Sequence, residues 1–422
     1  MIEGVFVGSE LLDNRVNTHE SFSGARLRSR GLRLRRATTV PDDRDLIAGA
    51  LAESLSRCDA VLVCGGLGPT FDDVTREGAA AALGRGLRFD RALWAEIERR
   101  FSRRAMPIPE ENKRQAFLIE GATALRNTVG SAPGQLIERL RVGRPPQTLA
   151  LLPGPLAELE PMFDRQVLPR LARAYARDRS TEQAVFRLSG IAESVADEKL
   201  AGITRKPGEG EEFTILSGNG QVDFFVTVTD SSRKRARQRL KGLRRRVLDA
   251  VGEDLFGEGN CTLESALAEA LRRRRWTLAV AESCTGGLVG QRLTSAPGSS
   301  RYFLGGVIAY DNAVKSALLG VPRGMLERHG AVSAACARAM AQGARRATGA
   351  TLGLSITGIA GPEGGTLAKP VGLVFVALAG PGSRDNACVK LSLGTGRQAV
   401  RQRAAAAALD LALRHCGKFV VE

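Results

Sequence analysis

Two long blocks of the chain alternate short apolar runs with stretches of helical periodicity, and a shorter, strand-rich block separates them. In the first block, up to about residue 170, this alternation of strand and helix patterns favours a parallel sheet covered by helices. The expected strands are 33–40, 60–63 and 148–152, and the expected helices are 47–56, 93–103 and 111–119.

The second block, 171–256, has a different pattern. Its apolar runs are short, rich in β-branched and aromatic residues, and separated by glycine-containing turns. We therefore expect a small α+β domain. Its expected elements are strands at 186–191, 213–216 and 222–228, a helix at 193–200, and a basic helix after the last strand.

The third block, 257–422, returns to the alternation of strands and helices. The sequence thus predicts a multidomain α/β protein with domains at 1–170, 171–256 and 257–422. In the last domain the expected strands are 277–281, 306–310, 352–357, 373–379 and 387–391, and the expected helices are 263–274, 287–294, 334–348 and 397–415.

The composition of the chain argues against several classes of protein. Hydrophobic residues make up 43% and charged residues 25% of the 422, which is typical of a soluble globular protein. No apolar run reaches the roughly 18 residues of a membrane span, and the start of the chain has neither the basic flank nor the cleavage site of a signal peptide. The seven cysteines form no CxxC pair, which favours a reducing cytoplasm. We expect a cytoplasmic protein with no membrane partner.

The net charge of +16 raises the question of nucleic acid binding. Of the 61 basic residues 52 are arginine, a skew that codon usage can produce across a whole proteome. Nine positive charges lie in the segment 233–246, but Leu240, Leu243 and Val247 recur through it at helical spacing. We interpret the segment as an amphipathic helix with a solvated basic face, and we do not expect nucleic acid as a partner.

The first candidate site follows the apolar run 61–64. Gly65, Gly66, Gly68 and Thr70 form a glycine-rich turn between a strand and a helix, where backbone N–H groups can hold a phosphate. Next come two acidic residues, Asp72 and Asp73, whose carboxylates are suitable ligands for Mg²⁺. The alternative is that Thr70 and the acids only cap the following helix.

Two weaker elements of the first domain also join an apolar run to polar residues. Glu10 lies in the segment 8–12, where a strand end turns into a helix. The segment 127–134 is a polar loop rich in glycine and proline that is able to wrap a ligand. Taken alone, each is more typical of a plain turn.

The third block contains the sharper chemistry. Ser283 lies in a polar turn after an expected strand, and Ser300, Tyr310 and Lys315 surround another strand. With only three histidines in the chain, a hydrolase built from these parts would use a serine nucleophile and a lysine or tyrosinate base. Burial would have to lower the pKa of that lysine. The alternatives are a surface lysine and a half-buried strand tyrosine.

Together these motifs resemble the CinA family, the competence/damage-inducible protein A family. In the first domain the resemblance rests on GSELL, GGLGPTFDDVTREG, EENKRQA, NTVGSAPG and LLPGP. In the last domain it rests on AESCTGG, SSRYFLGGVIAYDNAVK, GAVS, TGIAGPEGG and KPVG. The motifs extend over nearly the whole chain, in family order.

The resemblance implies two activities on NAD breakdown products. A C-terminal amidase without a cofactor would convert nicotinamide mononucleotide to nicotinic acid mononucleotide and ammonia. An N-terminal domain similar to molybdopterin-binding proteins would cleave the pyrophosphate of ADP-ribose with Mg²⁺ or another divalent metal and K⁺. The resemblance also implies a homodimer.

The family's amidase residues correspond to Ser300, Tyr310 and Lys315 in this chain, with Ser300 as the expected nucleophile and Ser283 as its rival. Arg397 is expected to pair with the substrate phosphate. The further residues expected to bind nucleotide in the C-terminal domain are Thr285, Gly286, Gly287, Thr357, Gly358 and Gly361.

The N-terminal motifs depart from the family pattern in two places. The segment 13–16 lacks the glycine that usually follows the ELL motif, and His19 stands where the family often has asparagine. These departures affect turnover more than binding. A molybdopterin-binding scaffold and a DNA-associated competence factor therefore remain as alternative functions.

Overall fold

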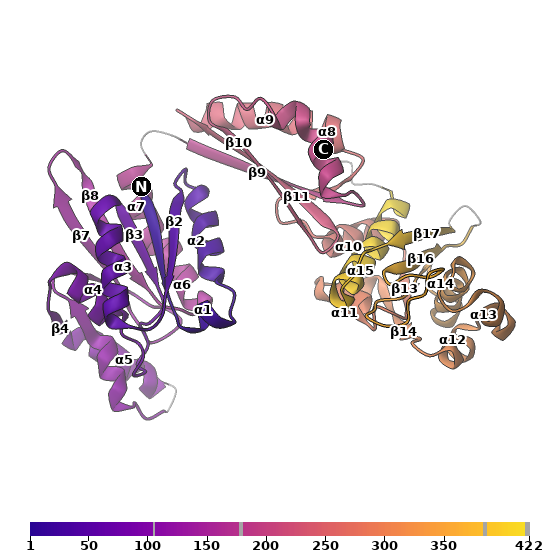
Figure 1. The fold of residues 1–422 in the computed structure, drawn as a ribbon, viewed down its shortest axis with the longest axis horizontal. Helices are drawn as coiled ribbons and strands as arrows, with labels where there is room; N and C mark the ends of the chain where they lie inside the picture. The colour runs from indigo at the N-terminus through magenta and orange to yellow at the C-terminus, as the bar shows by residue number, and fades with distance from the viewer. Residues whose placement is uncertain (104–105, 177–179, 383–385, 418–422) are drawn as a thin grey trace. The chain divides into compact units, whose positions relative to one another are not determined.

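The computed structural model of the protein describes residues 1–103, 106–176, 180–382 and 386–417 (Figure 1). Its internal contacts divide the chain into two compact units. The first unit comprises Met1–Glu182 and Thr229–Arg237, and the second comprises Gln183–Val228 and Gln238–Glu422. The predicted α/β class is confirmed. Among the described residues, no helix combines the length and the apolar character needed to cross a membrane.

A six-stranded sheet forms the centre of the first unit, with the order β2-β1-β3-β8-β7-β6. The four strands β2, β1, β3 and β8 are parallel, as the alternation of strands and helices predicts. β7 and β6 add two antiparallel strands that were not predicted from the sequence. The strands are β1 (Ile2–Val7), β2 (Leu34–Val40), β3 (Ala60–Cys64), β6 (Thr123–Leu125), β7 (Gly134–Arg141) and β8 (Arg144–Leu152).

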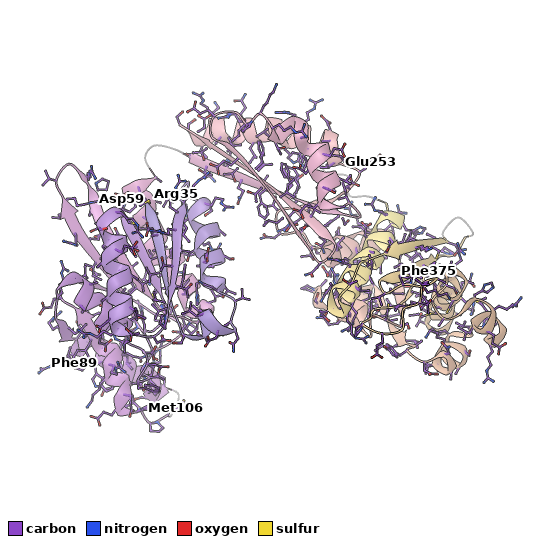
Figure 2. All side chains as sticks on the ribbon, viewed as in Figure 1. Arg35, Asp59, Phe89, Met106, Glu253 and Phe375 are labelled. Atoms are coloured by element: carbon purple, nitrogen blue, oxygen red, sulfur yellow. The ribbon has the colours of Figure 1, made fainter. Side chains whose placement is uncertain are left out.

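Helices cover both faces of this sheet because its central strands bury side chains on both sides (Figure 2). Phe6 of β1 packs with Leu27 and Phe163 on one face, and its neighbour Val5 packs with Ile47 on the other. The helices are α1 (Glu10–Asp13), α2 (Thr18–Arg28), α3 (Arg44–Arg57), α4 (Thr75–Leu83), α5 (Arg91–Arg103), α6 (Leu156–Met162) and α7 (Leu168–Tyr175), and a π-helical turn η2 (Phe163–Val167) joins the last two.

The helix expected at 111–119 is only partly correct. A 3-10 helix, η1 (Glu110–Ala116), covers most of it, and the last three residues form strand β5 (Phe117–Ile119). β5 pairs antiparallel with β4 (Leu87–Phe89). The consecutive apolar residues of β5 are better buried along a strand than around a helix, where they would occupy several faces.

The middle segment folds as βαββαβ, an arrangement of the split βαβ type. Its sheet has the order β10-β11-β9-β12, and the last strand was not foreseen from the sequence. The expected basic helix is present as α9, and Leu243 and Val247 of its apolar stripe are buried. The elements are β9 (Ser180–Ser189), α8 (Glu193–Thr204), β10 (Glu211–Gly218), β11 (Gln221–Asp230), α9 (Arg233–Val251) and β12 (Leu255–Glu258).

The C-terminal domain has a five-stranded sheet with the order β14-β13-β15-β16-β17. β14, β13 and β15 are parallel, so their carboxyl ends meet at one edge, whereas β16 and β17 are antiparallel. In such sheets ligands bind outside the carboxyl ends of the parallel strands. The strands are β13 (Leu278–Glu282), β14 (Phe303–Ile308), β15 (Leu352–Gly358), β16 (Leu373–Ala379) and β17 (Ala387–Ser392).

The helices of this domain pack on both faces of the sheet and form two large cores and one small cluster. The four helices expected from the sequence are present, whereas the short helices α12 and α13 were not predicted. The helices are α10 (Leu263–Arg274), α11 (Leu288–Ser295), α12 (Asn312–Leu319), α13 (Arg323–His329), α14 (Ala334–Thr348) and α15 (Arg397–His415), and a 3-10 turn η3 (Ser299–Arg301) precedes β14.

Candidate functional site

A cavity of about 450 Å³ lies at the carboxyl ends of the parallel strands β1 and β3 in the first unit. Six of the residues expected to bind ligand or metal line it, whereas Gly68 is not among its lining residues. The structure therefore brings together residues from two separate sequence motifs. The six are Glu10, Gly65, Gly66, Thr70, Asp72 and Asp73.

The loop after β3 requires glycine. Gly65 has φ +110°, and a Cβ atom there would lie 2.1 Å from the carbonyl oxygen of Val7. Gly66 has φ +63°, and its Cβ would lie 2.2 Å from Oγ1 of Thr75. Only glycine fits these positions, so the bare backbone of the loop borders the cavity, where a phosphate can approach it closely.

Two arginines that sequence analysis missed hold this loop. Arg76 is 1% exposed and donates hydrogen bonds to the carbonyl oxygens of Leu67 (2.7 Å) and Gly68 (3.0 Å). Arg114 donates to the carbonyl oxygens of Thr70 (2.5 Å) and Asp73 (3.1 Å). Carbonyl oxygens held in this way are kept from repelling an anion in the cavity. Neither residue could be recognised from the sequence, because the chain contains many arginines.

The two predicted metal ligands lie on the same loop. Oγ1 of Thr70 donates to Oδ1 of Asp72 (2.5 Å), and the backbone N–H of Thr70 donates to Oδ2 of Asp73 (2.8 Å). No group of three potential metal-binding side chains occurs in the described part of the chain. Mg²⁺ commonly uses one or two carboxylates together with substrate phosphates and water. This pair fits that mode of binding, and metal binding itself stays a prediction.

His19 and Asp42 also line the cavity, and the sequence had not selected them as site residues. Nε2 of His19 contacts the carbonyl oxygen of Gly154, so this nitrogen carries the proton, because a carbonyl oxygen can only accept. Nδ1 of His19 is buried and has no partner among the described residues. Asp42 accepts hydrogen bonds from the N–H (2.8 Å) and the hydroxyl (3.0 Å) of Ser9.

The second group of predicted residues gathers at the carboxyl edge of the C-terminal sheet. Ser283 follows β13, Tyr310 follows β14, and Thr357 and Gly358 end β15. Arg397, the first residue of α15, closes the group. Its guanidinium donates to the hydroxyl of Tyr310 (3.3 Å) and to the carbonyl oxygen of Gly361 (2.9 Å).

Lys315 is the most unusual residue of this edge. It lies in α12 and is only 1% exposed. Its Nζ donates to the carbonyl oxygen of Tyr310 (2.9 Å), and no carboxylate of the described residues forms an ion pair with it. Burial lowers its pKa below the ordinary value of 10.5, although nearby groups such as Cys336 and Asp311 oppose the shift. A lysine in this environment can act as a general base.

The expected role of the glycine turn needs correction. The N–H of Gly286 donates to the carbonyl oxygen of Ser283 (3.1 Å), and the N–H of Gly287 donates to the carboxylate of Glu282 (3.0 Å). Neither N–H is free for a substrate in this structure. Glu282, 1% exposed, also accepts from the N–H groups of Val289 (3.1 Å) and Gly290 (2.8 Å), so it caps the start of α11.

The donors left for a substrate precede these glycines. The N–H groups of Cys284 and Thr285 have no acceptor among the described residues, and the buried hydroxyl of Thr285 also lacks a partner. Arg401 holds the carbonyl oxygen of Thr285 (2.8 Å). Burial raises the pKa of Cys284 to about 11, which argues against a thiolate nucleophile at neutral pH.

The loop after β15 is organised by its own contacts. The hydroxyl of Thr357 donates to the carbonyl oxygen of Ala331 (2.9 Å), so it fixes the segment before α14. Gly358 packs against β16, where a Cβ would lie 2.7 Å from the carbonyl oxygen of Leu373. Gly361 has φ +79°. These residues shape the site through the backbone.

Ser300 lies apart from this group within one chain. It belongs to η3, before β14 begins, whereas Tyr310 and Lys315 follow the end of β14. At about 3.3 Å per residue, the six residues of β14 span about 20 Å. The structure thus brings Ser283 to the edge where Lys315 lies, but not Ser300 of the same chain.

The basic helix α9 carries fewer free charges than its sequence indicates. Its ion pairs reduce the field that a polyanion would meet, which weakens the alternative of nucleic acid binding. They join Arg233 and Arg237 to Glu182, Arg235 to Asp230, Arg239 to Glu211, and Arg244 to Glu258.

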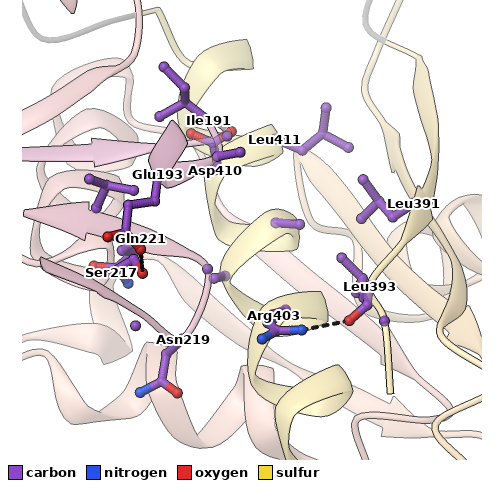
Figure 3. Close-up of a pocket in the computed structure, with 18 of the residues that line it drawn as sticks. Ile191, Glu193, Ser217, Asn219, Gln221, Leu391, Leu393, Arg403, Asp410 and Leu411 are labelled. Atoms are coloured by element: carbon purple, nitrogen blue, oxygen red, sulfur yellow. Dashed lines mark hydrogen bonds between the residues drawn. The ribbon is translucent and has the colours of Figure 1, made fainter. Parts of the chain in front are cut away.

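A larger cavity, of about 880 Å³, lies in the second unit beside α15 (Figure 3). None of the predicted site residues lines it. Near it, Asp410 accepts hydrogen bonds from the hydroxyl of Ser189 (2.5 Å) and from Nε of Arg414 (2.8 Å). Arg414 also donates to the carbonyl oxygen of Ser189 (2.9 Å), so this network fastens β9 to α15.

Comparison with known proteins gives three matches to family models, in chain order. A probable molybdopterin binding domain matches residues 4–173, a damage-inducible protein CinA KH domain matches 183–257, and a CinA C-terminal domain matches 260–416. The architecture is therefore a molybdopterin-binding-like domain, a KH-like middle domain and a CinA C-terminal domain.

Two relatives match along nearly the whole chain, and a solved structure matches part of it. A CinA-like protein of Koribacter versatilis is 39% identical over 97% of this chain and 98% of its own. A CinA-like protein of Gemmatimonas aurantiaca is 40% identical over 97% of this chain and 95% of its own. A solved competence/damage inducible protein from Agrobacterium tumefaciens is 34% identical, covers 36% of this chain and 93% of its own, and has a TM-score of 0.35.

Proposed function

The chain belongs to the CinA family, and from this premise we propose that its C-terminal domain hydrolyses the carboxamide of nicotinamide mononucleotide. The products are nicotinic acid mononucleotide and ammonia. The observation that carries the proposal is Lys315, a buried amine with a lowered pKa and no carboxylate partner among the described residues, beside the loops at the carboxyl edge. Such a lysine serves a serine amidase as base without a histidine.

The proposed reaction has two halves. A serine Oγ attacks the carboxamide carbon while Lys315 accepts the hydroxyl proton, and the carbonyl oxygen becomes an oxyanion. The C–N bond then breaks, and the nitrogen takes the proton from Lys315 and leaves as ammonia. Water hydrolyses the resulting ester, which gives the carboxylic acid and restores the serine.

Three groups would support this chemistry. The free N–H groups of Cys284 and Thr285 suit an oxyanion, because they are fixed donors with no acceptor within the described residues. Arg397 suits the phosphate of the nucleotide, since its planar guanidinium donates in a bidentate manner. Its position beside Tyr310 would hold the substrate across the carboxyl edge.

Two serines compete as nucleophile. Ser283 is 8% exposed and lies on the same edge as Lys315. Ser300, which the family resemblance favours, is exposed but lies at the opposite end of β14 in the same chain. If Ser300 is the nucleophile, it has to reach Lys315 from another subunit, which agrees with the expected homodimer.

We also propose that the N-terminal domain hydrolyses ADP-ribose to AMP and ribose 5-phosphate. Water attacks a phosphorus atom, and the P–O bond of the pyrophosphate bridge breaks. The support is the 450 Å³ cavity with its glycine loop and paired carboxylates. Asp72 and Asp73 would hold a divalent metal, which, with K⁺, would neutralise phosphate charge when bound. The protein itself would position the pyrophosphate on the loop after β3.

Each proposal has its own assay in the full-length chain. We expect ammonia release from nicotinamide mononucleotide in the presence of EDTA, with a loss of at least 100-fold in Lys315→Ala, because general base catalysis contributes about 10²–10⁴-fold. We expect ADP-ribose cleavage that requires a divalent metal and falls in Asp72→Asn. Asp72→Asn serves as the matched control for the amidase assay, and Lys315→Ala serves as the matched control for the assay of ADP-ribose cleavage. A folded wild-type chain that releases no ammonia refutes the amidase.

A further inference from the structure

The 880 Å³ cavity of the second unit lies where the KH-like segment meets the C-terminal domain (Figure 3). One side is formed by the loop between β9 and α8 and by the turn between β10 and β11. The other side is formed by β17, the segment that follows it, and α15. The volume is within the range of about 300–1,000 Å³ that is usual for small-molecule sites. No residue of the two proposed active sites lines this cavity, so it needs an explanation of its own.

Contacts at two places hold the walls of the cavity together. On one side Asp410 and Arg414 of α15 bind Ser189 of β9, as described above. On the other side the turn between β10 and β11 packs against α15, because a Cβ atom on Gly220 would lie 3.2 Å from the Cβ atom of Ala406. The cavity is therefore preformed, and a ligand would bind without the cost of ordering its walls.

Apolar side chains line a large part of the cavity without being fully buried. Figure 3 shows them around the same space, on the loop before α8, on β17 and on α15. A half-buried apolar wall of this kind is suited to a flat, weakly polar group such as a nucleobase. The residues are Ile191, Leu391, Leu393 and Leu411.

Two charged side chains add polar recognition to this wall. Nη1 of Arg403 donates to the carbonyl oxygen of Leu393 (2.8 Å), and no carboxylate of the described residues forms an ion pair with it. Its remaining donors suit a phosphate group. Glu193 accepts a hydrogen bond from Ser217 through Oε2, whereas its Oε1 accepts none from the described part of the chain. A carboxylate with a free oxygen suits the hydroxyl groups of a ribose.

We propose that this cavity binds a nucleoside monophosphate. Its phosphate lies on Arg403, its ribose hydroxyls on Glu193, and its base against the apolar wall. The charges favour a single phosphate, because the other arginine of the lining, Arg414, already pairs with Asp410. The inference does not depend on either proposed activity.

The cavity is distinct from the carboxyl edge of the C-terminal sheet, although α15 contributes to both. Arg403 follows Arg397 by six residues, which is about 9 Å along the helix axis and about 240° around it. The two arginines therefore lie on different faces of α15. Arg397 donates to Tyr310 and to Gly361, whereas Arg403 donates to Leu393. One nucleotide at Arg403 thus leaves Arg397 free for another ligand.

Binding of AMP to the full-length chain, measured by titration calorimetry, tests the proposal. The chain carries Gly65→Ala and Arg397→Gln, which are expected to disable the two proposed substrate sites, so that neither contributes to the signal. We expect one AMP per chain. Adenosine and ribose 5-phosphate should each bind at least about 10-fold more weakly, because the first lacks the phosphate and the second lacks the base.

Two further substitutions in this chain locate the bound AMP. Arg403→Gln keeps a donor for Leu393 but removes the charge, and should weaken AMP binding at least about 10-fold. Ala407→Trp fills the cavity and should abolish binding, with circular dichroism as the check on folding. The matched control is Arg328→Gln, because Arg328 is also exposed and donates to a backbone carbonyl, that of Gly324, and this variant should leave the affinity unchanged.

The other outcomes overturn the proposal. AMP that binds equally well after Arg403→Gln, or after Ala407→Trp, occupies a different site. Equal affinities for AMP and ribose 5-phosphate would show that the apolar wall takes no part in binding. Absence of any binding at about 1 mM AMP would show that the cavity is not a nucleotide site.

Discussion

Replacing Lys315 by methionine is expected to stabilise the protein while it abolishes ammonia release. Lysine is a costly residue at this position, because its amine is 1% exposed and has one carbonyl acceptor and no carboxylate within ion-pair distance in the described structure. Methionine has a similar length and no charge, so it fills the same space. A residue that costs stability and is needed for activity is the signature of a functional group rather than a packing group.

The magnitude follows from two opposing effects. Burial of a charged group costs several kcal/mol after relaxation. The hydrogen bond from Nζ to the carbonyl oxygen of Tyr310 returns about 1.5–3 kcal/mol, as bonds to charged groups do. We therefore expect Lys315→Met to raise the free energy of unfolding by about 2 kcal/mol at pH 7. For a unit of this size, that corresponds to a rise in Tm of about 4–8 °C.

The pH dependence supplies an independent check on the cause. The pKa of Lys315 is lowered in the folded state, so between that pKa and the unfolded value near 10.5 the unfolded chain binds more protons. The free energy of unfolding of the wild type therefore rises with pH through that interval, as far as it depends on Lys315. Below the interval the full cost of the buried charge remains. The advantage of Lys315→Met should shrink as the pH approaches 10.5.

We would compare the unfolding of the wild type and of Lys315→Met by calorimetry between pH 7 and pH 10.5. Ammonia release of both full-length chains is measured at pH 7. Leu318→Met, an exposed apolar position on the same helix, is the matched control and should change neither quantity. A destabilised Lys315→Met would show that the lysine contributes packing. A stability difference that does not vary with pH would refute the assignment of the effect to the buried charge.

Three further substitutions test other parts of the structure. The pKa of Glu3 is lowered to about 2, chiefly by its paired hydrogen bonds from Arg57. The stability that this pair contributes should therefore be present above pH 4.5 and be lost as the pH falls toward 2. An acid titration unchanged in Glu3→Gln contradicts this. Gly65→Ala should abolish ADP-ribose binding by calorimetry, because its Cβ has no space, while the amidase continues to work; unchanged binding would mean that the loop does not form the site. Asp410→Ala should lower the free energy of unfolding of the second unit by about 2–4 kcal/mol in urea, because it leaves the hydroxyl of Ser189 and the guanidinium of Arg414 without their acceptor. A loss below about 0.5 kcal/mol would refute a role for the network.

Sequence patterns predicted the elements that combine strong periodicity with clear ends. Helix α14 has the predicted bounds, because Ser333 caps its start and Gly349, with φ +72°, stops it. The strand β5 was missed, since three apolar residues fit a helix pattern as well as a strand, and its partner β4 lies 28 residues earlier. Pairing with a distant strand is not visible in a local pattern.

The candidate sites were predicted in a similarly uneven way. Motifs gave the residues at the loops, but not their separation in space. That Ser300 and Lys315 lie at opposite ends of one strand follows only from the position and direction of β14. The loop-holding residues Arg76 and Glu282 were missed because each acts through backbone groups, and a single sequence carries no sign of such contacts.

The two domains use the same architecture in opposite ways. Both place a glycine turn and a helix start after a parallel strand, an arrangement that offers N–H donors to an anion. In the first, Arg76 binds the loop carbonyls, and Val74 makes no side-chain cap at the helix start. The acidic residue of the first helical turn, Glu77, accepts a hydrogen bond from Arg114. In the second, Glu282 fills the corresponding position with its own carboxylate. An anionic ligand is thus favoured on the loop of the first domain. In the second domain the phosphate of a nucleotide has to be bound by a side chain instead. Arg397 is a cation at the same edge of the sheet and can take this role. The resulting division, with backbone donors for a pyrophosphate and an arginine for a mononucleotide, is what the two proposed substrates require.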